Sequence, residues 1–133
     1  MNTTSAHGPL STTILVCEDD EQLRALVETM LREHGYRVLL AAHAEQAVEI
    51  AAANAGGIDV VVTDVHLPHM TGPELVERLH TIQPAFEVLF LSGYPAEMVP
   101  GQPLPDGSEF LQKPFDETLL LQTIRSMLDT RHH

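Results

Sequence analysis

Residues 14–20 read Ile-Leu-Val-Cys-Glu-Asp-Asp, an unbroken apolar run that closes on three acidic side chains. Residues 60–64 read Val-Val-Val-Thr-Asp and end in the same manner. Short apolar runs without alternation are typical of strands that are buried on both faces of a parallel sheet. In such sheets functional groups gather just beyond the carboxyl ends of the strands. We therefore expect Glu18, Asp19 and Asp64 to meet at one edge of a sheet.

Segments with helical and strand-like patterns alternate along the remainder of the chain. The predicted strands cover residues 14–17, 37–42, 59–64, 87–91 and 109–112, and the predicted helices cover residues 21–34, 44–55, 73–82 and 116–129. Repeated β–α units form a parallel sheet covered by helices, with right-handed crossovers. The expected fold class is α/β, a flavodoxin-like (βα)5 three-layer sandwich with a five-stranded parallel sheet in strand order 2-1-3-4-5.

The stretch between Ser92 and Phe110 breaks this alternation where a fourth helix is expected. It contains Pro95, Pro100, Pro103 and Pro105 together with two glycines. A proline inside a helix costs ~3 kcal/mol, so a regular helix is disfavoured here. Only residues 96–99 could form a helical turn. We expect the fourth helix to be short or replaced by a Pro-rich loop.

Size and charge narrow the possible functions. A chain of 133 residues favours one domain, placed at residues 13–130 after a disordered leader at 1–12 and before a tail or tag remnant at 131–133. A net charge of −12 argues against nucleic-acid binding and against direct contact with a membrane surface. No apolar run approaches the ~20 residues of a membrane span. The single cysteine, Cys17, fits a reducing cytosol and is expected to be buried and unreactive.

Two further polar side chains close predicted strands. Ser92 follows the run at residues 88–91, and Lys113 follows residues 110–112. An acidic cluster is costly unless a cation lies in it, and oxygen ligands suit a hard cation such as Mg²⁺. Carboxylates, a metal ion, a hydroxyl and an ammonium group together indicate a site that handles phosphoryl groups.

Ordinary structural roles compete for some of these residues. Asp64 could be a helix cap or a solvated strand end, whereas Asp20 and Glu21 fit better as acids that complement the dipole of the following helix. His66 and His69 form a His-x-x-His pattern, which could suggest zinc. No cysteine or third histidine lies nearby in the sequence, so solvated loop histidines are favoured.

Four motifs, each at the end of a predicted strand, resemble the response-regulator receiver domain of bacterial two-component signalling. They are Ile14-Leu-Val-Cys-Glu-Asp-Asp-Glu21, Asp59-Val-Val-Val-Thr-Asp-Val-His-Leu-Pro-His-Met-Thr-Gly72, Leu89-Phe-Leu-Ser-Gly93 and Phe110-Leu-Gln-Lys-Pro-Phe115. The resemblance covers about residues 13–129. The sequence around Ser92 and Lys113 is most similar to that of receivers of hybrid sensor histidine kinases. The chain could be such a domain taken from a larger protein, or equally a stand-alone regulator.

The resemblance implies a phospho-acceptor and its metal site. Asp64 would accept the phosphoryl group from a phosphohistidine of a partner kinase. Glu18, Asp19 and Asp64 would hold Mg²⁺ (or Mn²⁺), together with the backbone carbonyl of His66. Lys113 would pair with the phosphoryl oxygens.

The resemblance also implies a set of residues that respond to phosphorylation. Ser92 would be the hydroxyl that moves toward the phosphoryl group, and Phe110 would be the switch aromatic. Pro114 would follow Lys113 through a cis peptide bond. His66 and Tyr94 would border the path of the hydrolytic water, and their bulk predicts moderately slow self-dephosphorylation.

The expected partners are a histidine kinase or a histidine phosphotransfer protein, in the cytoplasm or as part of a membrane-anchored kinase. Because the domain modifies itself, it is not an enzyme in the turnover sense. In this family the face formed by helix 4, strand 5 and helix 5 often dimerises. With a Pro-rich loop in that face, we expect a monomer or a weak dimer that does not use it.

Three other functions compete with this reading. An aspartyl-phosphate phosphatase would need a second acid two residues after the nucleophile, where this chain has His66. A flavodoxin-like FMN binder would need a Ser/Thr/Gly-rich phosphate cradle after the first strand, where Glu-Asp-Asp-Glu stands instead. A degenerate receiver that only docks partners would not need all of these chemical groups.

Overall fold

Five parallel strands form the central layer of the computed structural model, which describes residues 12–94 and 104–131. The strands are β1 (Thr13–Cys17), β2 (Arg37–Ala41), β3 (Val60–Asp64), β6 (Glu87–Ser92) and β7 (Glu109–Gln112). Their order is β2-β1-β3-β6-β7. This is the predicted order 2-1-3-4-5, because the labels also count two short strands outside the sheet. The predicted flavodoxin-like fold class is confirmed.

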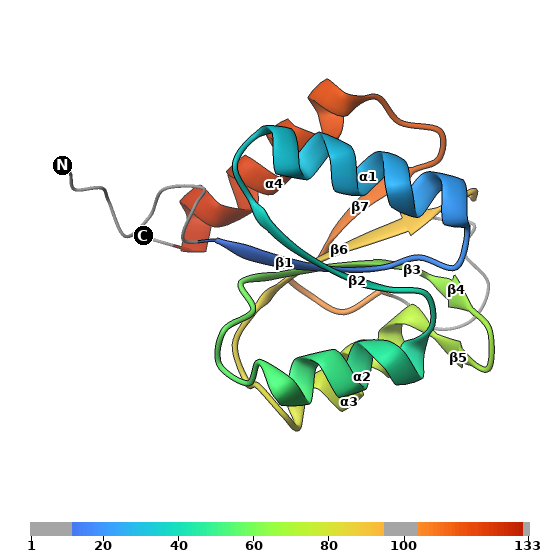
Figure 1. The fold of residues 1–133 in the computed structure, drawn as a ribbon, viewed down its shortest axis with the longest axis vertical. Coiled ribbons are helices and arrows are strands. Elements are labelled where there is room, and N and C mark those ends of the chain that lie inside the picture. Colours follow the sequence, from blue (N-terminus) through green and yellow to red (C-terminus); the bar gives the residue numbers. More distant parts are fainter. Residues whose placement is uncertain (1–11, 95–103, 132–133) are drawn as a thin grey trace, which may run out of the picture.

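Helices cover both faces of the sheet (Figure 1). They are α1 (Glu21–Glu33), α2 (Ala44–Ala53), α3 (Gly72–His80) and α4 (Glu117–Arg131). Successive strand residues point to opposite faces. Ile14 and Val16 therefore pack in the core beneath α1 and α4, while Leu15 and Cys17 pack in the core beneath α2 and α3. This double burial explains why the strands are continuous apolar runs.

Side-chain caps set the beginnings of the helices. Asp20 accepts a hydrogen bond from the Leu23 amide at 3.0 Å and caps α1, as an acid complementing the helix dipole would. At α4, Asp116 accepts a hydrogen bond from the Leu119 amide at 2.7 Å. At α3, Thr71 and Glu74 form a reciprocal capping box.

A short antiparallel hairpin between β3 and α3 was not predicted. It consists of β4 (His66–Leu67) and β5 (Met70–Thr71), which pair outside the main sheet. His69 in its turn has a φ of 70°, in the left-handed region. Two-residue strands around a proline carry no periodic pattern, so sequence patterns predicted only a loop here.

Several predicted boundaries move by one or two residues. Thr12, assigned to the leader, is buried, and its carbonyl accepts a hydrogen bond from the Arg37 amide. α4 continues to Arg131, beyond the predicted end at Asp129. On α1, Leu26 lies outside the buried face and is 50% exposed, although its spacing matches that of the buried Val27, Met30 and Leu31. The predicted Pro-rich loop and the possible turn at 96–99 lie mainly outside the described residues.

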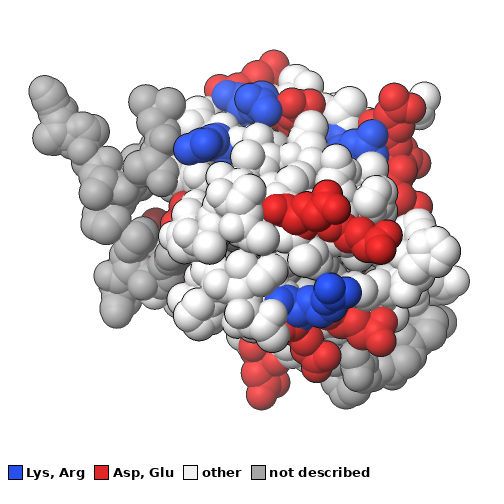
Figure 2. Space-filling model, turned by 60° about the horizontal axis from the view of Figure 1, so that its bottom comes forward, with Lys and Arg blue, Asp and Glu red and all other residues white. Residues whose placement is uncertain are grey.

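The surface is strongly acidic, in keeping with the net charge of −12. Figure 2 shows acidic side chains spread over a face on which basic side chains are few. Within the described residues, no helix combines the length and apolar character that crossing a bilayer requires.

Candidate functional site

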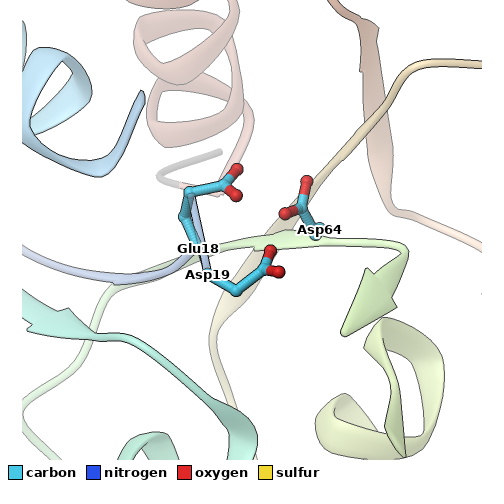
Figure 3. A group of neighbouring side chains, drawn as sticks. All are labelled: Glu18, Asp19 and Asp64. Carbon is cyan, nitrogen blue, oxygen red and sulfur yellow. The ribbon is translucent and has the colours of Figure 1, made fainter. Parts of the chain in front are cut away.

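Three carboxylates meet at the carboxyl edge of the sheet. Glu18 and Asp19 directly follow β1, and Asp64 ends β3, which pairs with β1. One oxygen from each residue lies within 4.8 Å of the others, and Figure 3 shows the three groups turned toward one another. Glu18 is fully buried and Asp64 is 4% exposed, whereas Asp19 is open to solvent. The sequence-based expectation of an acidic cluster at this edge is confirmed.

Lys113 supplies the positive charge of the site. Its Nζ lies 2.5 Å from Asp64 Oδ1 and 3.1 Å from Glu18 Oε1. Its backbone amide donates to the Ser92 carbonyl at 2.7 Å, which fixes the end of β7 against β6. The Lys113–Pro114 peptide bond is cis. Lys113 is the only lysine of the chain, so this ammonium group is chemically unique.

The buried side chains of Glu18, Asp64 and Lys113 shift one another's pKa values. Burial and a hydrogen bond to Glu18 raise the pKa of Asp64 to about 8, against the opposing effect of Lys113. Burial also acts to raise the pKa of Glu18, but hydrogen bonds to Asp64, the Asp20 amide and Lys113 leave it below its ordinary value. Pairing with both acids outweighs burial and raises the pKa of Lys113. In the metal-free protein Asp64 therefore keeps its proton to a higher pH than an ordinary carboxyl group, whereas Glu18 loses its proton more readily.

The residues present fit a hard divalent cation. Asp64 Oδ1 is buried and forms a short ion pair with the Lys113 ammonium. The donor set consists of oxygen atoms alone, as Mg²⁺ and Mn²⁺ prefer. A cation bound there would neutralise the carboxylates and favour the ionised form of Asp64. His66 and His69 belong to no metal-type cluster in the described part of the chain, which leaves the zinc alternative unsupported.

Ser92 stands beside the acceptor at the end of β6. Its hydroxyl oxygen is buried and accepts a hydrogen bond from the Tyr94 amide at 3.0 Å. A hydroxyl group can also donate once, so its hydrogen remains free for another partner. The Tyr94 ring lies edge-on to the His66 ring, with centroids 5.8 Å apart. The two residues that were expected to border the water path therefore touch each other.

Phe110 lies one strand further along the sheet, on β7. It is half-buried and packs against a small core of Val65, Val76, Val88 and Phe90. Cys17 is buried as expected, and burial together with the nearby Asp64 charge raises the pKa of its thiol to about 12. Such a thiol stays protonated and unreactive.

Arg24 is part of this site, although sequence patterns gave no sign of it. Its guanidinium donates to the Glu18 backbone carbonyl at 2.9 Å, from the end of the first turn of α1. The Glu18 side chain in turn accepts from the Asp20 amide at 2.9 Å. Both contacts hold the backbone of the acidic pair. Only the position of Arg24 on the helix that follows the acids could have suggested this contact.

Fold and site together define a flavodoxin-like α/β domain that concentrates acids, a lysine and a hydroxyl at the carboxyl edge of its sheet. The chain belongs to the response regulator receiver domain family, whose model matches residues 14–125, and is thus a receiver domain of two-component signalling.

The similar proteins include a sensor kinase. The chain is 37% identical over 121 residues to the sensor kinase CckA of Brucella abortus, covering 90% of this chain but 13% of that relative. The crystal structure of the receiver domain from the hybrid histidine kinase CckA has a TM-score of 0.77 and 35% identity, covering 87% of this chain and 98% of that one. A response regulator receiver protein from Sinorhizobium medicae has a TM-score of 0.78 and 27% identity, with 91% and 97% coverage.

Proposed function

We propose that Asp64 accepts a phosphoryl group from the phosphohistidine of a histidine kinase or a histidine phosphotransfer protein. The observation that carries this proposal is the buried Asp64 carboxylate, paired with Lys113 and facing Glu18 and Asp19. An Asp64 oxygen attacks phosphorus, and the bond from phosphorus to the imidazole nitrogen breaks. The nitrogen keeps the electron pair and takes up a proton. The product is an acyl phosphate on Asp64 and a free histidine.

The neighbouring residues have roles that follow from their charge. Phosphoryl transfer depends mainly on positioning and on neutralising the charge of the phosphoryl oxygens. The Lys113 ammonium neutralises one of these oxygens when it leaves Asp64. The free hydrogen of the Ser92 hydroxyl is donated to another. Glu18, Asp19, Asp64 and the His66 carbonyl would hold a divalent cation, which would supply the remaining positive charge.

We further infer that the hydrogen bond from the Ser92 hydroxyl to the phosphoryl group begins the conformational change that follows phosphorylation. It can form only after the phosphoryl group has arrived, so it is a local event that biases the loop after β6. The Phe110 side chain, on the neighbouring strand β7, would then change position together with this loop. The altered face would change which partner binds, either downstream of a kinase or within a larger protein similar to a hybrid kinase. The cytoplasmic location and the absence of a strong dimer through the usual face remain predictions.

Intact mass spectrometry tests the acceptor directly. After incubation with acetyl phosphate and Mg²⁺, the wild type is expected to gain one phosphoryl group, and a chelator is expected to abolish the gain. Asp64→Asn should gain nothing because the amide is not a nucleophile for phosphorus. Asp106→Asn, at an exposed acid in a described loop, serves as the control and should behave as wild type.

Two results would contradict the proposal. Phosphorylation of the Asp64→Asn protein would place the acceptor elsewhere. No phosphorylation of the wild type, even by a phosphorylated partner kinase, would favour a degenerate receiver that only docks partners. Rapid turnover of many phosphate esters would instead favour a phosphatase.

The contact between His66 and Tyr94 predicts the lifetime of the acyl phosphate. The two ring centroids lie 5.8 Å apart, and we expect the paired rings to obstruct an attacking water. Replacing both by alanine is expected to speed hydrolysis about tenfold, which corresponds to a barrier lower by about 1.4 kcal/mol. The decay of the phosphorylated mass with time measures this rate. Single replacements give the control, and an unchanged rate in the double variant would refute the obstruction.

A further inference from the structure

Gly72 lies against the backbone of the proposed acceptor. It is the first residue of α3 and is buried. A Cβ atom added there would overlap the Asp64 carbonyl oxygen and would lie 3.1 Å from both the Asp64 carbonyl carbon and the Val65 Cα. These neighbours are main-chain atoms, which cannot rotate away as a flexible side chain can. Gly72 is not in the left-handed region, so the close approach, and not a special backbone angle, requires glycine here.

Hydrogen bonds hold the same segment from the other sides. The Gly72 amide donates to the Val65 carbonyl at 2.6 Å and closes the base of the β4–β5 hairpin. The Val65 amide donates to the Leu91 carbonyl at 2.9 Å, and the Thr63 hydroxyl donates to the Asp64 carbonyl at 3.0 Å. The Asp64–Val65 peptide is therefore confined between β6 and the start of α3. These hydrogen bonds restrict how far the backbone can shift to make room for a Cβ atom.

We propose that Gly72 is a positioning residue for phosphoryl acceptance. Its missing side chain lets α3 approach the end of β3, and this approach sets the position of the Asp64 carboxylate. The same contact sets the hairpin that carries the His66 carbonyl. The inference rests on the proposed function of Asp64. A displacement of about 1 Å at a reacting group can cost a factor of about 100 in rate, so even a small shift would be measurable.

The test compares Gly72→Ala with a neighbouring variant that weakens the same helix. Thr71→Ala removes the side chain that caps α3 but adds no atom near Asp64. Gly93→Ala controls for the loss of a glycine near the site, since nothing lies within 4 Å of its added Cβ. The readouts are the phosphorylation rate with acetyl phosphate at saturating Mg²⁺, the affinity for Mn²⁺, and thermal unfolding. Gly72→Ala is expected to slow phosphorylation at least tenfold, while both controls stay within about twofold of wild type.

A second variant covers the case in which Gly72→Ala does not fold. Thr63→Val keeps the shape of a buried strand residue and removes the hydrogen bond to the Asp64 carbonyl. It is expected to slow phosphorylation several-fold with unchanged secondary structure. Equal rates in folded Gly72→Ala and Thr71→Ala would overturn the proposal, as would a wild-type rate in Thr63→Val if Gly72→Ala does not fold.

The wild type in the same assay separates two kinds of failure. If the wild type takes up no phosphoryl group from acetyl phosphate or from a phosphorylated partner kinase, the function proposed for Asp64 fails. The affinity for Mn²⁺ then tests whether Gly72 positions the Asp64 carboxylate. Mn²⁺ binding weakened by Gly72→Ala but not by Thr71→Ala would still support it. Unchanged Mn²⁺ binding would overturn it.

Discussion

Replacing Lys113 with methionine is expected to lower the free energy of unfolding of the metal-free protein by about 2–4 kcal/mol at pH 8. The variant keeps the aliphatic length of the side chain and removes its ammonium group. Glu18 and Asp64 would then face each other, both buried, without the cation that lies 3.1 and 2.5 Å from them. The expected loss is below that of a fully isolated buried charge, because one proton can still be shared by the two acids.

The loss should depend on pH in a defined direction. The pKa of Asp64 is raised to about 8 in the folded protein, so between about pH 4 and pH 8 the folded state holds a proton that the unfolded chain has lost. Its contribution to stability is therefore present at low pH and falls as pH rises through this window. Without Lys113 the folded acids hold their protons still more strongly. The penalty of Lys113→Met should be small near pH 4 and largest near pH 8.

Urea unfolding with a chelator present measures this effect across the pH range. Arg78→Met, at an exposed cation on α3, is the matched control and should change stability by less than about 0.5 kcal/mol. Adding Asp64→Asn to Lys113→Met should recover most of the loss, because it removes one of the two uncompensated acids. A Lys113→Met protein that follows the control at every pH would refute the proposed balance of charges.

Gln83→Leu is expected to destabilise the domain by about 3 kcal/mol, although the residue lies at the opposite edge of the sheet from the site. The Gln83 side chain is buried. Its oxygen accepts from the amides of Gly56 and Ile58 at 2.9 and 3.2 Å. Its nitrogen donates to the carbonyls of Ile58 and Ala85. Leucine would leave the buried amide and carbonyl of Ile58 without this partner, and each such group carries a desolvation penalty.

Chemical denaturation checks this prediction, with Gln122→Leu on the exposed face of α4 as the control. Gln83→Glu keeps the oxygen that accepts from Gly56 and Ile58 but turns a charged oxygen toward two carbonyls, so it should also be destabilising. Because the Gln83 side chain and its hydrogen bonds are remote from Asp64, the folded fraction of either variant should still be phosphorylated at the wild-type rate. If Gln83→Leu lowers the free energy of unfolding by less than about 1 kcal/mol, water molecules replace the hydrogen bonds of Gln83 and the prediction is wrong.

Sequence patterns predicted the sheet and the acidic cluster because both depend on local information. Continuous apolar runs identify strands that are buried on both faces, and the residue that ends each run must lie at the carboxyl edge. Glu18, Asp19, Asp64, Ser92 and Lys113 were therefore predicted to meet from their positions at strand ends. The roles proposed for them came from the resemblance to a family and await the experiments above.

Other features could not be predicted, because they depend on contacts between distant parts of the chain. The β4–β5 hairpin has two-residue strands with no periodicity, and Gln83 gives no local sign that its amide joins two loops. Arg24 looks like any exposed helix residue until its contact with the Glu18 carbonyl is seen.

For this protein, the sequence by itself determined the fold class, the strand order and the set of groups at the carboxyl edge. Periodicity, caps and strand-end residues are properties of short segments, so they can be recognised in the sequence without the rest of the structure. Only the tertiary structure decided how closely those groups approach. Three features depend on how strands and helices pack across many residues of separation: the raised pKa of Asp64 beside Glu18, the pairing with Lys113 and the contact of Gly72 with the Asp64 carbonyl. Packing of that kind fixes distances to within an ångström, which no local pattern of residues encodes.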